Sequence, residues 1–264
     1  MTLGLHARRG LSRPARVACD LAGYALGGLL GAAAGLRRGK AVHPMGAVHR
    51  AELVTWGDPG PASGAELLEQ AGSRSALVRF SRSLGLPRPL PDLLGMSVRV
   101  LDAYGPGWHQ DLLMVTSIDA PVLHQLFLPA SDVQRRPYSS SLPYRAGAER
   151  FVVGALPVPS SPRPDGCDEL ERLDRAAATG RLAFHLAAAP RWGRFHPVAE
   201  LRIGTRLADA ADALRFNPWN TGGGLEPVGI LNRLRDYAYP LSQRAWGATG
   251  PDGAQQAAER AVAG

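Results

Sequence analysis

The sequence predicts an α+β domain, in which an antiparallel β-barrel or β-sandwich is surrounded by helices. Four short strand-like runs follow one another in the first half of the chain, separated by turns that contain Pro and Gly. Two more strand-like runs occur in the second half. Short strands in sequence with turns between them favour an antiparallel sheet that closes into a barrel or packs as a sandwich.

The first four strands are expected at residues 47–56, 75–81, 95–102 and 109–116. Loose alternation of apolar and polar residues marks the first of them, and Asp58-Pro59-Gly60-Pro61 ends it. Residues 65–71 have the pattern of a short helix. The turns that separate the later strands contain Pro and Gly, which interrupt regular structure.

The pattern changes between Asp119 and Thr179. Residues 121–127 look helical, 133–146 are polar with a proline and a serine run, and 157–166 form a proline-rich loop. A charged helix is expected at 169–178. Strands are expected at 182–189 and 196–207, followed by a helical turn at 209–214 and a short Ala-rich helix at 254–263.

Composition indicates a globular protein of one domain of fair size or two small ones. The chain has 264 residues, of which 45% are hydrophobic and 20% charged. Its net charge of +7 raises the question of nucleic-acid binding. The arginines are scattered, aromatic residues make up only 6%, and the sequence has no helix-turn-helix, zinc-finger or RNA-binding motif. We therefore expect no nucleic-acid partner.

Cysteine usage and the N-terminal segment bear on the cellular location. Cys19 and Cys167 have neither a metal-ligand spacing nor a disulfide framework, so a cytoplasmic location is expected. Residues 17–36 form an apolar stretch of about membrane-spanning length between clusters of basic residues. Its Gly and Ala content and Asp20 favour a helix that packs on protein. Membrane association through 17–36 remains the alternative.

The stretch from Leu214 to Trp246 carries the most chemical information. Residues 217–224 are rich in turn formers and cannot form a regular element, whereas 228–240 should be a helix that starts near Pro227 and stops at Pro240. Arg235 and Tyr239 lie four residues apart on that helix, on one face. A neighbouring guanidinium favours the phenolate, a hard anionic ligand that haem iron can take. The alternative is an Arg in a salt bridge and a Tyr in the core.

Five segments resemble, in order, the haem catalase superfamily. They are Val42-His43-Pro44-Met45-Gly46-Ala47, Val78-Arg79-Phe80-Ser81, Pro91-Asp92-Leu93-Leu94-Gly95-Met96-Ser97-Val98-Arg99-Val100, Gln110-Asp111-Leu112-Leu113, and the 214–246 stretch with its F-x-P-x-N, L-x-P and R-x-x-x-Y-P patterns. The resemblance covers roughly residues 40–247 and implies the catalase-type β-barrel. It divides the chain into a basic and apolar helical arm at 1–39 and a haem-binding barrel domain at 40–264, as in small catalase-related proteins that lack a C-terminal domain.

The resemblance also implies roles for individual residues. Tyr239 would be the axial ligand to the iron of haem b, with Arg235 keeping its phenolate charged, and His43 would act as general base and then acid. Lys40 and Arg79 would pair with the haem propionates. Ser81 matches a serine whose hydroxyl bonds the catalytic histidine.

Two further positions, Thr116 and His49, bear on the proposed site. Thr116 falls where the family has an asparagine that holds the peroxide, and a hydroxyl does not reproduce the reach of an amide. Full catalase turnover is therefore in doubt. His49, on the strand after His43, is the nearest competitor for the role of His43. Residues 119–179 depart most from ordinary catalases, and the resemblance places them over the barrel mouth.

These observations predict a haem-dependent oxidoreductase that acts on hydrogen peroxide or an organic hydroperoxide, a catalase-related peroxidase that forms a homo-oligomer. One alternative is a haem-binding carrier or sensor without turnover; another is a biosynthetic haem enzyme that converts a hydroperoxide. An enzyme without haem, such as a hydrolase, is disfavoured because the sequence has no Walker loop, no G-x-S-x-G and no H-E-x-x-H motif.

Overall fold

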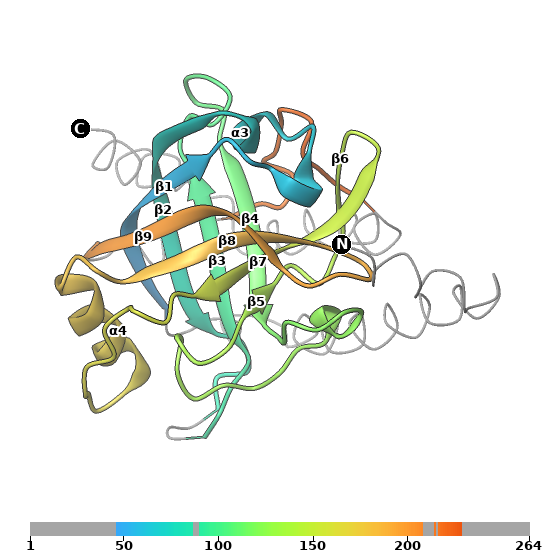
Figure 1. Cartoon of the computed structure of the whole chain (residues 1–264). Coiled ribbons are helices and arrows are strands. Elements are labelled where there is room, and N and C mark those ends of the chain that lie inside the picture. The colour runs from blue at the N-terminus through green and yellow to red at the C-terminus, as the bar shows by residue number, and fades with distance from the viewer. Residues whose placement is uncertain (1–45, 87–89, 208–213, 215, 229–264) are drawn as a thin grey trace, which may run out of the picture.

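The computed structural model describes residues 46–86, 90–207, 214 and 216–228 (Figure 1). Strands dominate this part of the chain. They are β1 (Gly46–Trp56), β2 (Ala71–Arg82), β3 (Leu94–Val100), β4 (Gln110–Thr116), β5 (Tyr138–Ser139), β6 (Tyr144–Ala146), β7 (Glu149–Pro157), β8 (Ala183–Pro190), β9 (His196–Leu207) and β10 (Glu226–Pro227). The helical segments are η1 (Gly60–Ala62), α3 (Glu66–Glu69), η2 (Leu123–Gln125) and α4 (Glu169–Ala178).

The strands close into an antiparallel β-barrel. β1 to β5 pair in sequence order, β5 pairs with β7, and β1 pairs with β9 on the other side. The ring is completed by β8, which pairs with both β9 and β7. Closure removes the exposed sheet edges that an open sheet would leave. The predicted α+β barrel is confirmed, and β6 and β10 extend the sheet beside β7.

The barrel interior holds the main hydrophobic core. On β2 and β3, alternate residues such as Val78, Phe80, Met96 and Val98 point into this core and are fully buried. Phe80 and Tyr138 pack against Phe184 of β8, with ring centroids 5.8 Å and 6.1 Å away. Since side chains alternate across a strand, the residues between these point to the outer surface of the barrel.

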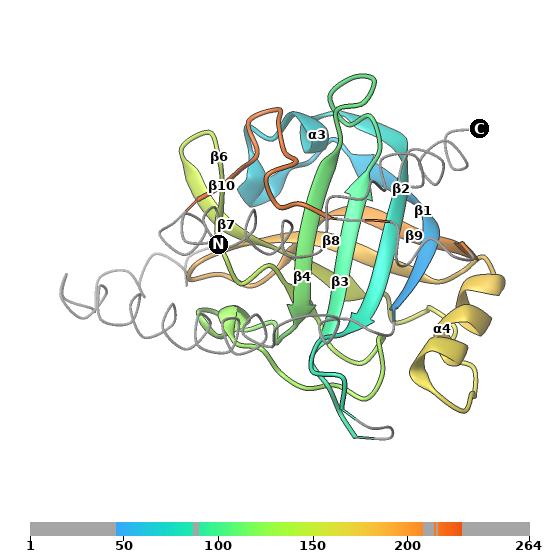
Figure 2. The ribbon, with the colours of Figure 1, turned by 180° about the vertical axis from the view of Figure 1, so that it is seen from behind.

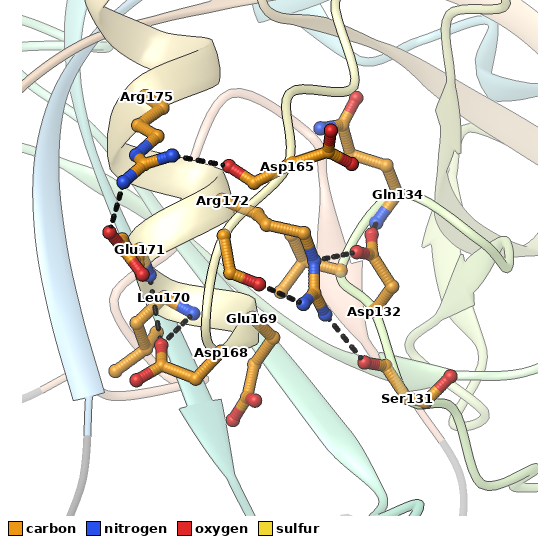
Figure 3. Close-up of polar contacts among 12 residues, drawn as sticks. Ser131, Asp132, Gln134, Asp165, Asp168, Glu169, Leu170, Glu171, Arg172 and Arg175 are labelled. Atoms are coloured by element: carbon orange, nitrogen blue, oxygen red, sulfur yellow. Dashed lines mark hydrogen bonds and ion pairs between the residues drawn. The ribbon is translucent and has the colours of Figure 1, made fainter. Parts of the chain in front are cut away.

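Helix α4 packs its apolar face onto the core through Leu173, Ala176 and Ala177, all buried. The Asp168 side chain caps its N-terminus by accepting hydrogen bonds from the N–H groups of residues 170 and 171 (Figure 3). Arg172 ties the helix to the preceding loops through Asp132 at 2.8 Å and two backbone carbonyls. The predicted helix at 169–178 is confirmed with the same bounds.

Strand β7 was not predicted from the sequence. The expectation that all of residues 119–179 lies over the barrel mouth is wrong for this segment, because Glu149–Pro157 forms part of the barrel wall. Its run from Phe151 to Ala155 is buried on both faces, so it shows no alternation of apolar and polar residues. A continuous apolar run of this length does not reveal its period.

Two smaller expectations also need correction. The helix expected at 121–127 is a single 3-10 turn at Leu123–Gln125, preceded by Val122 with a φ of 67°. Pro227 does not start a helix; it lies in β10 and pairs with Tyr144. The helices expected at 228–240 and 254–263 and the turn at 209–214 fall, except for Val228 and Leu214, outside the described residues.

In the described part of the chain, none of the helices has the length and apolar character needed to cross a membrane. The arm at 1–39, including the apolar stretch at 17–36, lies outside the described residues.

Candidate functional site

The structure describes three of the residues to which the sequence assigns a role, namely Arg79, Ser81 and Thr116. Lys40, His43, Arg235 and Tyr239 lie outside the described residues. The candidate site is therefore built from the outer face of β1 to β4, which Figure 2 shows toward the viewer.

Arg79 and Ser81 lie side by side on this outer face. They alternate along β2 with Val78 and Phe80, which point into the core. Strand register gives each of them a row of neighbours across the sheet. The Arg79 row comprises Val48, Arg79, Ser97 and Leu113, and the Ser81 row comprises Gly46, Ser81, Gly95 and Val115.

Two glycines on this face lie against the polar side chains. A Cβ atom at Gly46 would come within 3.1 Å of Nε and Nη2 of Arg79, and one at Gly95 within 2.8 Å of the Ser81 hydroxyl. Because Gly46 and Gly95 have no side chain, the Arg79 guanidinium and the Ser81 hydroxyl occupy the space above them. The structure thus brings together the two residues predicted from the V-R-F-S segment.

Thr116 is not part of this face. It follows Leu112 and Met114 on the inner side of β4, is fully buried, and its hydroxyl accepts a hydrogen bond from the N–H of Leu94 at 3.2 Å. The residue of β4 that shares the outer face with Ser81 is Val115, which pairs with Gly95. The sequence of β4 could not have revealed this, because Leu112 to Val115 is a continuous apolar run without alternation.

His49, the alternative to His43, also points away from this face and into the barrel interior. Its imidazole is fully buried in the core, packed edge-on against Phe80 with the ring centroids 6.0 Å apart. The Nε2 atom lies 2.9 Å from Oδ1 of Asp174 on α4, and the other oxygen of Asp174 accepts from Arg206 at 3.0 Å. His49 therefore links the barrel interior to α4.

Burial lowers the pKa of His49 below its ordinary value of 6.5, although the Asp174 carboxylate opposes the shift. A histidine whose pKa is lower in the folded state binds more protons when unfolded. The free energy of unfolding should then fall as the pH drops below about 6.5 through the folded-state pKa. Urea unfolding of wild type and His49→Gln at pH 7.5 and 5.5 tests this. We expect a smaller loss at low pH in the variant; equal losses would contradict the prediction.

The chain segment from Phe216 to Asn220 is anchored on the outer face of β3 and β4 by a buried ion pair. Arg99 donates from Nε and Nη2 to the two oxygens of Asp111, both at 2.7 Å. Asp111 also accepts from the N–H of Asn217 at 2.8 Å, and its own N–H donates to the carbonyl of Asn220 at 2.8 Å. The Arg99 guanidinium lies over the Phe216 ring, 5.3 Å from its centroid.

The glycine run that follows is a loop, as the sequence predicts, and packs closely against the barrel end. A Cβ atom at Gly223 would lie 2.3 Å from the Tyr104 ring, and one at Gly224 would lie 2.3 Å from the carbonyl oxygen of Gly64. The Tyr104 hydroxyl donates to Gln110 at 2.8 Å, as does the Thr221 hydroxyl at 3.0 Å. These contacts fix the point from which the chain continues to Val228. The F-x-P-x-N pattern indicated a turn here, but nothing in the sequence indicated Tyr104 as its partner.

An apolar cluster covers the outer face beside Arg79. Its members are Val48, Leu77, Leu101, Leu214 and Phe216, with Leu113 and Leu207 packed against them. Its five members are between 0% and 8% exposed, so the cluster packs Leu214 and Phe216 against the barrel. Arg79 at its border could pair with a carboxylate, as a haem propionate would require. Among the described residues, no cluster of His, Cys, Asp and Glu side chains could hold a metal ion.

Comparison with solved structures identifies the architecture. The chain matches a bacterial catalase with a TM-score of 0.52 and 14% identity, over 80% of this chain and 58% of that one. It matches a fungal catalase with a TM-score of 0.57 and 13% identity, over 82% and 62%. For catalase A from Saccharomyces cerevisiae the TM-score is 0.55 and the identity 11%, over 82% and 64%. The chain has a catalase-like fold.

At these identities the likeness is one of fold, and the catalase-like chain spans between 58% and 64% of the length of the three catalases. No protein-family model matches the sequence, and no curated protein matches it. The catalase-like fold agrees with the resemblance read from the five sequence segments. The fold alone does not define the chemistry of the outer face of β1 to β4.

Proposed function

We propose that this protein is a haem-dependent oxidoreductase that acts on hydrogen peroxide or an organic hydroperoxide. The observation that carries the proposal is the placement of Arg79 and Ser81 side by side on the outer face of β1 to β4, beside an apolar cluster, in a catalase-like barrel. A peroxide-related function is the coarser inference that the fold supports. Haem binding and the roles of the individual residues go beyond that inference and make up the proposal.

The roles proposed for the residues follow from their chemistry. Haem b would supply a ferric iron that binds the peroxide and promotes cleavage of its oxygen–oxygen bond. Tyr239 would hold the iron through its phenolate, with Arg235 stabilising that negative charge. Arg79 and Lys40 would each pair with a haem propionate through charge-assisted hydrogen bonds.

Proton movement would fall to His43. Its imidazole would accept the proton from the incoming peroxide oxygen and return it to the oxygen that leaves. The Ser81 hydroxyl would hydrogen-bond the imidazole and keep its ring oriented. A peroxidase needs these two proton transfers and a source of electrons, but it does not need to handle a second peroxide molecule at the same place.

Replacing Tyr239 by phenylalanine tests the axial ligand. The phenyl ring cannot bind iron, so we expect the purified variant to retain little haem or to have an altered ferric spectrum. Tyr237→Phe, two residues away in the same stretch, is the matched control and should keep the wild-type spectrum. An unchanged spectrum in Tyr239→Phe would remove this residue from the proposal.

Replacing Arg79 by glutamine tests the propionate contact. One charge-assisted hydrogen bond is worth about 1 to 3 kcal/mol, so haem affinity should fall by roughly 5- to 150-fold. Competition for haem by apomyoglobin measures this loss. Arg74→Gln, a more peripheral arginine on the same strand, should leave the affinity unchanged. If the two variants lose affinity equally, Arg79 has no specific role.

A further inference from the structure

The connection from β4 to β5, residues 117–137, contains a turn with an unusual placement of polar and apolar side chains. At η2 the polar residues His124 and Gln125 are 0% and 6% exposed, whereas Leu123 is 47% exposed. Ile118, near the start of the connection, is 37% exposed. A single exposed leucine is common in soluble proteins, but polar residues buried beside it require a specific arrangement. Figure 1 shows this turn in green beyond the lower end of β4.

Hydrogen bonds hold the turn in this orientation. The Ser117 hydroxyl, which is fully buried, lies 2.9 Å from the carbonyl oxygen of His124. The Nδ1–H of His124 donates to the carbonyl of Ala120 at 3.0 Å. The N–H of Val122 donates at 3.1 Å to the carbonyl of Arg191, in the connection between β8 and β9. The turn is therefore ordered before a partner binds, which reduces the entropy lost on binding.

Val122 adopts a strained backbone conformation next to Leu123. Its φ is 67°, and a β-branched residue rarely takes a positive φ because its side chain crowds the backbone. Such a conformation persists only where the surroundings impose it, and it is concentrated at functional segments. Here it accompanies the outward orientation of Leu123 and the inward orientation of His124.

Arginine residues are gathered at the same end of the barrel. The connections 117–137 and 190–195 are joined by a hydrogen bond and together contain four arginines and two aspartates. Arg135 is exposed, and the side chain of Arg194 is 70% exposed. The surface around Leu123 therefore has more positive than negative groups.

Both carboxylates in these connections have partners within the protein. Asp119 accepts from the N–H of Phe195 at 2.9 Å and lies 3.8 Å from the Arg194 guanidinium. Asp132 accepts from Arg172 of α4 at 2.8 Å. The end of the barrel around the turn therefore combines exposed apolar side chains with net positive charge.

We infer that the turn at Leu123 is a docking surface for a membrane that contains anionic lipids. Leu123 and Ile118 enter the interfacial region of the bilayer, and the nearby arginines pair with lipid phosphate groups. A fluid lipid surface accommodates protruding side chains, whereas a protein partner needs a pocket for each of them. A second copy of this chain fits less well, because a two-fold contact would place the same positively charged surface against itself. The inference is independent of haem.

Co-sedimentation of the full chain with vesicles tests this inference. The vesicles consist of phosphatidylcholine alone or of phosphatidylcholine and phosphatidylglycerol in equal amounts. Wild type should bind the anionic vesicles more tightly, and raising the salt from about 0.05 M to about 0.5 M should weaken binding because ions screen the arginines. Leu123→Ser should lower the partition coefficient for anionic vesicles roughly tenfold, since an apolar contact is lost. Arg194→Gln should lower it about fivefold, the effect of one interfacial charge.

Trp108→Ser is the matched control. Trp108 is 68% exposed, but it lies in the hairpin between β3 and β4, at the opposite end of β4 from Ile118 (Figure 1). This variant should bind as wild type does, whereas Ile118→Ser should weaken binding as Leu123→Ser does. If Leu123→Ser binds as wild type does, which is the expected result if binding runs through 17–36, the inference is overturned. Wild type that binds neither kind of vesicle, or a Leu123→Ser variant that loses self-association but not vesicle binding, would overturn it as well.

Discussion

Asp111→Ala is expected to lower the free energy of unfolding by about 3 to 5 kcal/mol, the range for breaking a buried ion pair. The side chain of Asp111 is fully buried and that of Arg99 is 3% exposed. Removing the carboxylate leaves the Arg99 guanidinium without its closest acceptor in a place where water cannot replace it. It also releases the N–H of Asn217, which Asp111 holds at 2.8 Å. The anchor of the Phe216–Asn220 segment on β4 is then weakened.

Urea unfolding followed by tryptophan fluorescence measures this loss. Glu226→Ala is the matched control, since it breaks the exposed pair between Arg145 and Glu226 on β6 and β10. Exposed pairs contribute about 0 to 1 kcal/mol, so the control should change the midpoint little. If Asp111→Ala is no more destabilising than Glu226→Ala, the Arg99–Asp111 pair does not anchor the segment.

Gly224→Ala is expected to destabilise the protein by roughly 2 to 5 kcal/mol. Gly224 has a φ of 78°, a conformation that costs an L-residue about 1 to 2 kcal/mol. The added Cβ would also lie 2.3 Å from the carbonyl oxygen of Gly64. Because that contact is to backbone, the loop or the barrel end must move, and overpacking of this kind costs about 1 to 3 kcal/mol.

Gly107→Ala separates the cost of the positive φ from the cost of the contact with Gly64. Gly107 has the same φ of 78°, but a Cβ atom there would meet nothing within 4 Å. Its thermal unfolding should report the backbone strain alone, and the difference between the two variants should report the contact with Gly64. Equal losses in the two variants would show that the loop adjusts to the added methyl group without strain.

The strands that the sequence predicts well are apolar runs bounded by clear turns, and β1 also shows loose alternation. Burial on both faces does not by itself hide a strand, since β3, β4 and β8 are as buried as β7 and were predicted. Strand β7 escapes prediction because its short apolar run lies between a polar stretch and a proline-rich stretch that both indicate loops. Closure of the barrel depends on its pairing with β8, so the sequence pattern alone leaves the choice between barrel and sandwich open.

The sequence likewise predicts some residues of the candidate site and misses others. The V-R-F-S segment leads to Arg79 and Ser81 on one face, because residues two apart on a strand share a side. Thr116 was assigned by its order after Asp111, and one residue of offset moves it to the opposite face from Val115. The Arg99–Asp111 anchor and the contact of Tyr104 with the glycine run join segments more than a hundred residues apart in the sequence. Local patterns carry no signal for such pairings.

The central claim is that this catalase-like barrel binds haem, and titration of the purified full chain with haemin tests it most directly. We expect saturable binding with a stoichiometry of about one haem per chain, a Soret band and a high-spin ferric spectrum typical of a tyrosinate ligand. Guaiacol oxidation on addition of a peroxide should follow. A protein that shows no saturable haem binding would contradict the claim, and with it the roles proposed for Tyr239, His43 and Arg79.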